Sequence, residues 1–339
     1  MSFSAEISRR RFLRQSFAFS ALASLGASLT PLADALAPSA SAAEILMIGD
    51  WGYEDDHTGQ KAVAAGMRRY AQQHALHPDA LLFLGDNWYG ALEGGAQSPR
   101  WQTQFEQMYP AQDFPCTAYA ILGNHDYQMY PMSKVDAELE YARSGKSRFT
   151  MPARWYTFDF PAKNPLITFI ALDSNVPYKD GSTSHGRDFT ISQQQHKDQI
   201  AWLEAQLQRK RTTPYLVVMA HHPVYSDGPH GDHATLIKDW DPLFRKYGVQ
   251  VYLAGHDHDL QHLEFDGHPT SFFLSGGGGA DLYDLKIQES ARGPYAKKVY
   301  GFSQLSVTKE KMTLRHFDSD PKLLHAFSKT PAGKVSIAS

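Results

Sequence analysis

The sequence has 339 residues but a single cysteine, Cys116, so no disulfide can form within the chain. It also has no internal repeat and no block of like charge of the kind found in disordered tails and nucleic-acid-binding arms. After residue 42, no segment approaches the roughly twenty continuous apolar residues that cross a bilayer. We therefore expect a core stabilised without disulfides, no binding to nucleic acid by bulk charge, and no membrane span in the mature chain.

The charge balance is mildly acidic. The formal net charge is −3, and residues 1–42 carry four arginines against two acidic residues, which leaves −5 for residues 43–339. A protein of this charge has no general attraction for anions. An anionic ligand would therefore require positive charge at its own site, and bound metal ions supply such charge compactly.

The N-terminus is typical of an export signal. The basic segment SRRRFLR at 8–14 precedes a moderately apolar stretch rich in Ala, Ser and Leu, and ASA at 40–42 offers small residues for cleavage. It resembles a twin-arginine signal. We therefore expect residues 1–42 to be a signal peptide, the twin-arginine export machinery to be a partner, and residues 43–339 to form one domain in the periplasm or outside the cell. The alternatives are a basic tail or, without cleavage, a short membrane anchor. Since this route exports folded proteins, it favours a cofactor inserted before export.

Five short apolar runs each end in a small residue followed by polar side chains. They are ILMI-GD at 45–50, ALLFL-GDN at 80–87, AIL-GNHD at 120–126, YLVVM-AHH at 215–222 and VYLA-GHDH at 251–258. Each run predicts a buried strand. Because the carboxyl ends of parallel strands meet at one edge of a sheet, the five polar clusters are expected to converge there.

The order of elements predicts an α/β fold. Helical periodicity at 60–74 and 192–209 separates some of the strands, as in sheets covered by helices. Residues 155–160, 166–173 and 305–317 have instead the pattern of a hairpin-rich sheet. A four-layer α/β/β/α sandwich of two mixed sheets accommodates both kinds of segment.

Seven residues of these clusters have side chains that bind metals. Carboxylate, phenolate and imidazole suit Fe, Mn and Zn, and seven such ligands are enough for two ions that share one carboxylate. They are Asp50, Asp86, Tyr89, Asn124, His221, His256 and His258. Any one of them alone has a structural explanation, such as an Asp after Gly in a turn or a surface His. Five clusters in sequence favour metal binding. The nearby Trp51, Trp88 and Tyr53 are expected either to wall a pocket or simply to pack.

The same clusters carry a family resemblance. GDWG at 49–52, GDNWY at 85–89, GNHD at 123–126, VMAH at 218–221 and GHDH at 255–258 resemble the ordered blocks of the calcineurin-like metallophosphoesterases. The resemblance covers roughly residues 44–320 and implies that family's fold for a catalytic domain at 43–339. Tyr89, three residues after Asp86, narrows it to the purple acid phosphatases, especially the small tartrate-resistant type, whose tyrosinate gives the purple colour by charge transfer to Fe(III).

The resemblance also implies a division of the ligands. Asp50, Tyr89 and His258 would bind Fe(III). Asn124, His221 and His256 would bind a divalent Fe, Zn or Mn ion, with Asp86 bridging both. Anionic and strongly donating groups suit the trivalent ion, whereas neutral amide and imidazole suit the divalent one.

The activity implied is that of an acid phosphatase. A hydroxide bound to metal would attack the phosphorus of a phosphate monoester in line, and His125 and His230 would assist at the phosphoryl group or the leaving oxygen. At one position the sequence departs from the family, because Pro229 replaces the acidic residue before His230. This leaves the proton donor open between His125 and His230. His222, next to a ligand, is expected to orient its neighbours rather than to bind metal.

Other functions remain compatible with the sequence. The same ligands would also serve a phosphodiesterase or a nucleotidase, because ligands alone do not select the substrate. A metal-binding or phosphate-binding module without turnover and a redox-active iron protein are the alternatives from other classes. The substrate expected first is a small phosphate ester.

Overall fold

The computed structural model describes residues 42–53, 57–128, 134–177, 190–286 and 292–338. The described residues from 42 to 337 belong to one compact unit that contains every helix and strand given below. Apart from its last residue, Ala42, the expected signal peptide lies outside the described residues. Among the described residues, no helix is long and apolar enough to cross a membrane.

The first sheet has eight strands in the order β15-β14-β13-β12-β1-β2-β3-β4. Strands β1 to β4 run parallel, and β12 to β15 continue the sheet as an antiparallel meander from β1. Their bounds are β1 Ala43–Ile48, β2 Ala80–Phe83, β3 Thr117–Ala120, β4 Phe149–Thr150, β12 Gly301–Val307, β13 Met312–Asp318, β14 Leu323–Lys329 and β15 Val335–Ile337. The expected hairpin at 305–317 is therefore confirmed as part of β12 and β13.

The second sheet has seven strands in the order β11-β9-β10-β8-β7-β6-β5. Strands β10, β8, β7 and β6 run parallel, whereas β5, β9 and β11 pair antiparallel at the two sides. Their bounds are β5 Tyr156–Phe160, β6 Ile167–Ala171, β7 Tyr215–Met219, β8 Val251–Ala254, β9 Leu260–Leu263, β10 Ser271–Ser275 and β11 Tyr295–Lys297. Both sheets are mixed, as predicted.

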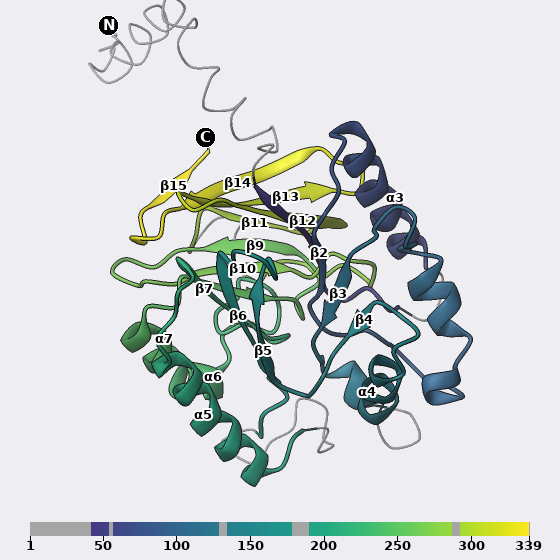
Figure 1. Cartoon of the computed structure of the whole chain (residues 1–339), viewed down its shortest axis with the longest axis horizontal. Helices are drawn as coiled ribbons and strands as arrows, with labels where there is room; N and C mark the ends of the chain where they lie inside the picture. The colour runs from purple at the N-terminus through teal and green to yellow at the C-terminus, as the bar shows by residue number, and fades with distance from the viewer. Residues whose placement is uncertain (1–41, 54–56, 129–133, 178–189, 287–291, 339) are drawn as a thin grey trace, which may run out of the picture. The chain divides into compact units, whose positions relative to one another are not determined.

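Helices cover the two sheets on different sides (Figure 1). Helices α3 (Thr58–Gln73) and α4 (Val135–Arg143) lie by the first sheet, and α5 (Gln193–Gln208), α6 (Ala234–Asp239) and α7 (Asp241–Tyr247) lie by the second. Two 3-10 helices, η1 (Gly95–Gln97) and η3 (His125–Tyr127), and one π-helix, η2 (Trp101–Glu106), complete the elements described. Helix α5 begins where the sequence predicts, because Ser192 and Gln195 form a capping box at its N-terminus.

The alternation of side chains along β12 and β13 shows how the layers stack. Phe302 and Phe317 face α3, where their rings meet Tyr70 at centroid distances of 5.7 and 4.5 Å. Their neighbours face the second sheet: Ser303 donates to the Ser275 hydroxyl at 2.8 Å, and His316 stacks on a ring of β10. Together with the helices on the second sheet, this arrangement confirms the α/β/β/α order.

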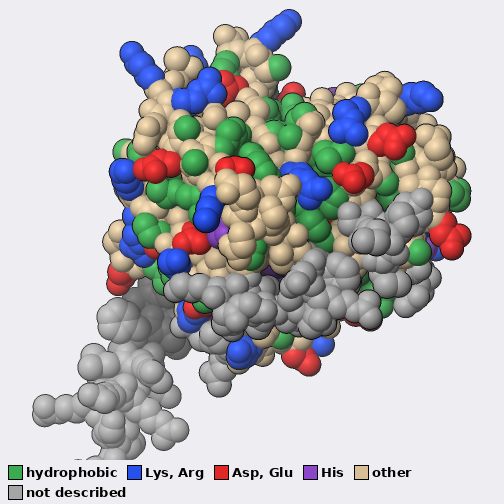
Figure 2. Space-filling view, turned by 90° about the horizontal axis from the view of Figure 1, so that it is seen from below, with side chains coloured by type: hydrophobic (Ala, Val, Ile, Leu, Met, Phe, Trp, Pro, Cys, Tyr) green, Lys and Arg blue, Asp and Glu red, His purple; other side chains and the backbone are tan. Residues whose placement is uncertain are grey.

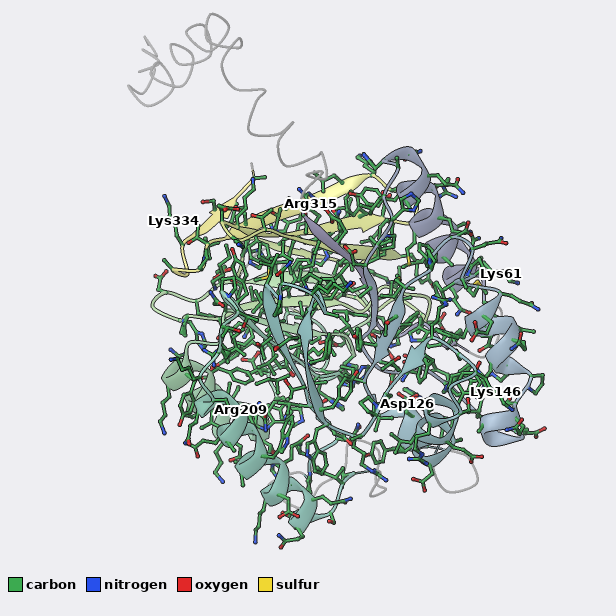
Figure 3. The ribbon with its side chains drawn as sticks, in the orientation of Figure 1. Lys61, Asp126, Lys146, Arg209, Arg315 and Lys334 are labelled. Atoms are coloured by element: carbon green, nitrogen blue, oxygen red, sulfur yellow. The ribbon has the colours of Figure 1, made fainter. Side chains whose placement is uncertain are left out.

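The exposed surface carries charges of both signs. Figure 2 shows one face on which Lys and Arg side chains alternate with Asp and Glu. Inside the fold, one charged side chain illustrates how a buried cation is held. Arg315, labelled in Figure 3, is 3 % exposed and donates to Gln304 at 3.1 Å.

Candidate metal centre

The carboxyl ends of parallel strands from both sheets supply the predicted ligands. Asp50 lies two residues after β1, Asp86 three after β2 and Asn124 four after β3. From the second sheet, His221 follows β7 and His256 follows β8 by two residues each. Because these strand ends lie together, the side chains converge as the sequence predicts.

Three of the side chains form a compact cluster. One ligand atom each of Asp50, Asp86 and His221 lies within 4.8 Å of the other two, and all three residues are buried. The Nε2 atom of His221 is 3.3 Å from Asp86 Oδ2 and 3.8 Å from Asp50 Oδ1. Among the described residues, this is the only cluster of His, Cys, Asp and Glu of this density.

The remaining predicted ligands lie next to this cluster. Tyr89 Oη lies 3.0 Å from Asp86 Oδ2, 3.3 Å from Asp50 Oδ1 and 3.0 Å from His258 Nε2. Asn124 Oδ1 lies 3.2 Å from His221 Nε2 and 2.9 Å from His256 Nδ1. Tyr89 thus contacts Asp50 and His258, and Asn124 contacts His221 and His256. Asp86 Oδ2 contacts both Tyr89 and His221, and Asp50 likewise accepts the backbone N–H of His256 at 2.9 Å, so the structure brings all seven residues together.

Hydrogen bonds fix the orientation of two imidazoles. The Nδ1 atom of His221 lies 2.8 Å from the carbonyl oxygen of Leu84, and that of His258 lies 2.5 Å from the carbonyl oxygen of Asp281. A carbonyl oxygen accepts only from a protonated nitrogen, so Nδ1 carries the proton in each ring. The lone pair of a neutral ring is then on Nε2, which faces the cluster.

Three candidate ligands have a backbone conformation that only glycine adopts without strain. The φ angle is 59° at Asp50, 50° at Asp86 and 72° at His256. Such a conformation costs about 1–3 kcal/mol at each residue and is concentrated at functional sites. The tight turn at Asp86 also needs Gly123 opposite, since a Cβ there would lie 2.2 Å from Asp86 Oδ1.

The buried acidic groups of the cluster favour the binding of cations. Burial raises the pKa of Asp50, and burial together with the carboxylates of Asp86 and Asp50 raises the pKa of Tyr89 well above 10. Burial alone would lower the pKa of His221, but the same two carboxylates raise it to about 10. Buried acidic groups at this density are stable when paired or bound to metal. Carboxylate, phenolate and imidazole around Tyr89, and amide and imidazole around Asn124, fit two metal ions.

Asp126 supports two of the ligand loops. Its carboxylate is fully buried and accepts backbone N–H groups of Gly123 at 2.8 Å, Trp88 at 2.9 Å and Asn87 at 3.2 Å. Figure 3 labels its position beside α4. One side chain therefore ties the loop that carries Asp86 to the loop that carries the next ligand. The sequence shows Asp126 in the GNHD block but not what it bonds.

Both predicted catalytic histidines line a cavity of about 470 Å³ over the cluster. The ring of His125 lies over that of Tyr89 at 4.1 Å, and its backbone N–H donates to Asp86 Oδ1 at 2.8 Å. His230 lies at the exposed rim with its ring 4.2 Å from that of His256. Each is thus placed against a candidate ligand and open to the cavity.

Some residues near the cavity do not lie where the sequence led us to expect, and one residue of its lining was not predicted. Trp51 and Trp88 do not wall the cavity: both are fully buried and pack with each other at 5.4 Å. His222 Nδ1 lies 2.8 Å from the Ser174 hydroxyl oxygen, and its orienting role stays a prediction. Tyr283 lines the cavity and stacks on His258 at 4.1 Å. No sequence signal identifies Tyr283, because it belongs to no motif.

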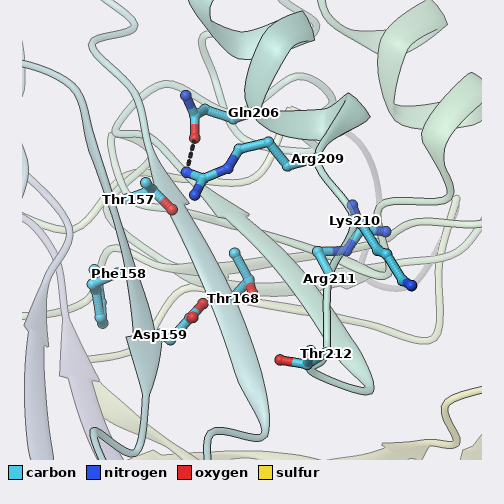
Figure 4. Close-up of a pocket in the computed structure, with 9 residues that line it drawn as sticks. All are labelled: Thr157, Phe158, Asp159, Thr168, Gln206, Arg209, Lys210, Arg211 and Thr212. Carbon is cyan, nitrogen blue, oxygen red and sulfur yellow. Dashed lines mark hydrogen bonds between the residues drawn. The ribbon is translucent and has the colours of Figure 1, made fainter.

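A second hollow lies away from the cluster, between β5, β6 and the end of α5 (Figure 4). It measures about 320 Å³ and has basic side chains, of which Arg209 donates to Gln206 at 2.9 Å. Its lining residues include Asp159 but no histidine. It therefore lacks the donors that the metal cluster has.

The profile of the calcineurin-like phosphoesterase family matches residues 43–260, and the chain belongs to this family. It is therefore a hydrolase of phosphate esters. Within the family it is similar to tartrate-resistant acid phosphatase type 5 of Homo sapiens, with 30% identity over 327 residues that cover 90% of this chain and 96% of that protein. It is also 27% identical to purple acid phosphatase 7 of Arabidopsis thaliana, over 84% of each chain.

Solved structures share the fold. GAP50 of Plasmodium superposes with a TM-score of 0.67 at 19% identity and covers 88% of this chain and 90% of its own. The purple acid phosphatase PPD1 of yellow lupin (Lupinus luteus) superposes with a TM-score of 0.62 at 17% identity, over 86% of this chain and 54% of its own. At these identities the likeness concerns the fold alone.

Proposed function

We propose that the chain is an acid phosphatase that hydrolyses phosphate monoesters, with water displacing the alcohol in line at phosphorus. We further propose that its centre holds Fe(III) and a divalent Fe, Zn or Mn ion. The observation that carries this proposal is the grouping of the seven side chains about Asp86. The named relatives, which are acid phosphatases, support the same choice.

The donor set assigns each ion its residues. Asp50, Tyr89 and His258 would hold the ferric ion, Asn124, His221 and His256 the divalent ion, and Asp86 both. When bound, the ions would supply Lewis acidity toward the phosphate oxygens and lower the pKa of bound water. The strained backbone at three of these residues would keep the donors in place before the ions and the substrate arrive.

The rest of the site would bind and orient the ester. His125 and His230 reach the cavity from two loops, and an imidazole N–H at either position would donate to a phosphoryl or leaving-group oxygen. The cavity of about 470 Å³ accommodates a small organic group beside the phosphate. Tyr283 and several histidines line the cavity and would contact the bound ester.

A comparison of two substrates tests the reaction class. The mature chain, at equal metal loading, would be assayed with p-nitrophenyl phosphate and with bis(p-nitrophenyl) phosphate, alongside a His125→Ala variant. The proposal predicts faster turnover of the monoester and a loss in the variant of about 10²-fold or more. Faster turnover of the diester would favour a diesterase, and phosphate binding without turnover of either would favour a binding module.

We also propose that the chain leaves the cytoplasm by the twin-arginine route, since SRRRFLR and the small residues at 40–42 fit such a signal. Replacing Arg9 and Arg10 by lysine should leave the uncleaved chain in the cytoplasm when cell fractions are compared by blotting. Unchanged export of the double variant would contradict this route.

A further inference from the structure

The loop at 226–233 brings His230 to the rim of the cavity without a helix or strand of its own. It follows β7 and ends at His233, whose Nδ1 caps α6 by accepting the N–H of Leu236 at 3.4 Å. Four of its residues, 230–233, line the cavity. A loop of this kind places a side chain accurately only where contacts from outside hold it.

Asp257 holds the loop from the metal side. Its Oδ1 lies 2.6 Å from His230 Nδ1 and accepts the backbone N–H of His230 at 3.3 Å, while its Oδ2 accepts the Ser226 hydroxyl. The contact is close, because a Cβ at Gly228 would lie 2.4 Å from Asp257 Cγ. With Nδ1 occupied by Asp257, Nε2 is the ring nitrogen of His230 left for a ligand in the cavity.

The ring of His230 also contacts two other rings. It lies 4.2 Å from the ring of His256 and 5.5 Å from that of Tyr283, at an interplanar angle of 67° to the tyrosine. Hydrogen bonding fixes the rotation of the ring, and these two contacts fix its plane. Although Pro229 precedes His230 in the sequence, a carboxylate, that of Asp257, contacts its ring.

Arg292 holds the same loop from the opposite side. Its Nη1 and Nη2 donate to the two carboxylate oxygens of Asp232 at 2.9 and 2.8 Å, and Nε donates to Asp227 Oδ1 at 2.6 Å. Nη2 also donates to the carbonyl oxygen of Ser226 at 3.1 Å. Asp227 is fully buried, and the Arg292 side chain is 26 % exposed. A bidentate guanidinium with this number of partners is a strong fixed contact.

We propose that Asp257 and Arg292 are positioning residues that hold loop 226–233 over the metal centre, so that His230 presents Nε2 to the phosphate ester. The inference rests on the proposed function for the nature of the ligand. The contacts of Asp257 and Arg292 with the loop do not depend on which reaction the site catalyses. Asp257 acts directly on the His230 ring, and Arg292 acts on the loop that carries it.

The first experiment measures the loop without reference to catalysis. Hydrogen–deuterium exchange of the metal-loaded mature chain would be compared for wild type, Arg292→Met and Arg292→Lys. Arg69→Met is the matched control, because Arg69 also bonds an aspartate and a carbonyl, Asp320 and Ser319, at a distant site. We expect faster exchange at 226–233 in Arg292→Met, a smaller change in Arg292→Lys and none in the control. Unchanged exchange in Arg292→Met would overturn the role of Arg292.

The second experiment asks whether the loop acts through His230. A double-mutant cycle of Arg292→Met and His230→Ala would use kcat/KM for p-nitrophenyl phosphate and the affinity for inorganic phosphate, with metal content checked in each variant. Each single change should lower kcat/KM by about 10²-fold, and the double variant should be little worse than His230→Ala. Additive losses would show that Arg292 does not position His230.

Asp257 is tested by a conservative pair. Asn at 257 retains an acceptor for His230 Nδ1–H, so Asp257→Asn should keep most of the activity that Asp257→Ala loses at equal metal content. Equal loss in both would contradict the orienting role. A wild type without monoester turnover would refute the proposed function, while the exchange data and the phosphate-affinity cycle would still decide the positioning of His230.

Discussion

Replacing Asp126 should weaken both the fold and the metal centre. In Asp126→Ala, three backbone N–H groups, those of Gly123, Trp88 and Asn87, lose their acceptor in a fully buried place. Each buried donor left without a partner costs about 1–3 kcal/mol. With partial relaxation of the two loops, we expect the free energy of unfolding to fall by about 3–6 kcal/mol, a large part of a typical total of about 5–15 kcal/mol.

Asp126→Asn is a graded test of the same reasoning. Asp126 Oδ2 accepts from Gly123 and Asn87, and Oδ1 accepts from Trp88. An amide keeps one acceptor oxygen, which can still accept from Gly123 and Asn87. Only the N–H of Trp88 then loses its acceptor. The expected loss is about 1–3 kcal/mol.

Urea denaturation of the metal-free chain, with metal analysis of the reconstituted chain, measures both effects. Asp136→Asn is the control, because the Asp136 side chain is 89% exposed and should change stability by less than about 0.5 kcal/mol. If Asp126→Ala unfolds within about 1 kcal/mol of wild type and binds metal fully, Asp126 is not the support that its hydrogen bonds indicate.

Two further predictions concern packing and pH. Gly123→Ala should displace Asp86, because the new Cβ would lie 2.2 Å from Asp86 Oδ1. Metal analysis should then show loss of bound metal from a chain that remains folded by circular dichroism. Full metal occupancy in this variant would contradict the close approach of Gly123 to Asp86. Burial, with His262 beside it, lowers the pKa of His325 to about 3, so between pH 6.5 and about 3 the unfolded chain takes up a proton that the folded chain does not. The free energy of unfolding should therefore fall with decreasing pH across this window, with at most about 1.4 kcal/mol per pH unit coming from His325. In His325→Gln the free energy of unfolding should depend less steeply on pH. The same pH dependence in urea titrations of both chains would contradict the lowered pKa of His325.

Much of the centre was predictable because its signals are local. A run such as ILMI followed by Gly-Asp marks a buried strand and a ligand just after it, and the common edge of parallel strands then brings Asp50 and Asp86 together. The helix at 192–209 was also predictable, since its periodicity is a pattern of residues close in the chain. These features depend on neighbours along the chain.

What the sequence did not reveal depends on contacts across the fold. Arg292 contacts Asp227 and Asp232, which lie 65 and 60 residues before it in the chain, and no motif links them. Tyr283 reaches the cavity from a segment without regular structure. The sequence also left open whether Trp51 lines the pocket or packs in the core. The answer depends on the space that the neighbouring layer of the fold leaves for its side chain.

The most direct test of the proposed centre is a visible absorption spectrum of the purified mature chain, with metal analysis, for wild type and Tyr89→Phe. We predict about two metal ions per chain in wild type and a broad visible band that disappears in Tyr89→Phe, because the phenolate oxygen of Tyr89 would bind the ferric ion. A colourless wild type with full monoester activity on zinc or manganese would contradict the iron-tyrosinate centre. A band that persists in Tyr89→Phe would show that Tyr89 is not its source.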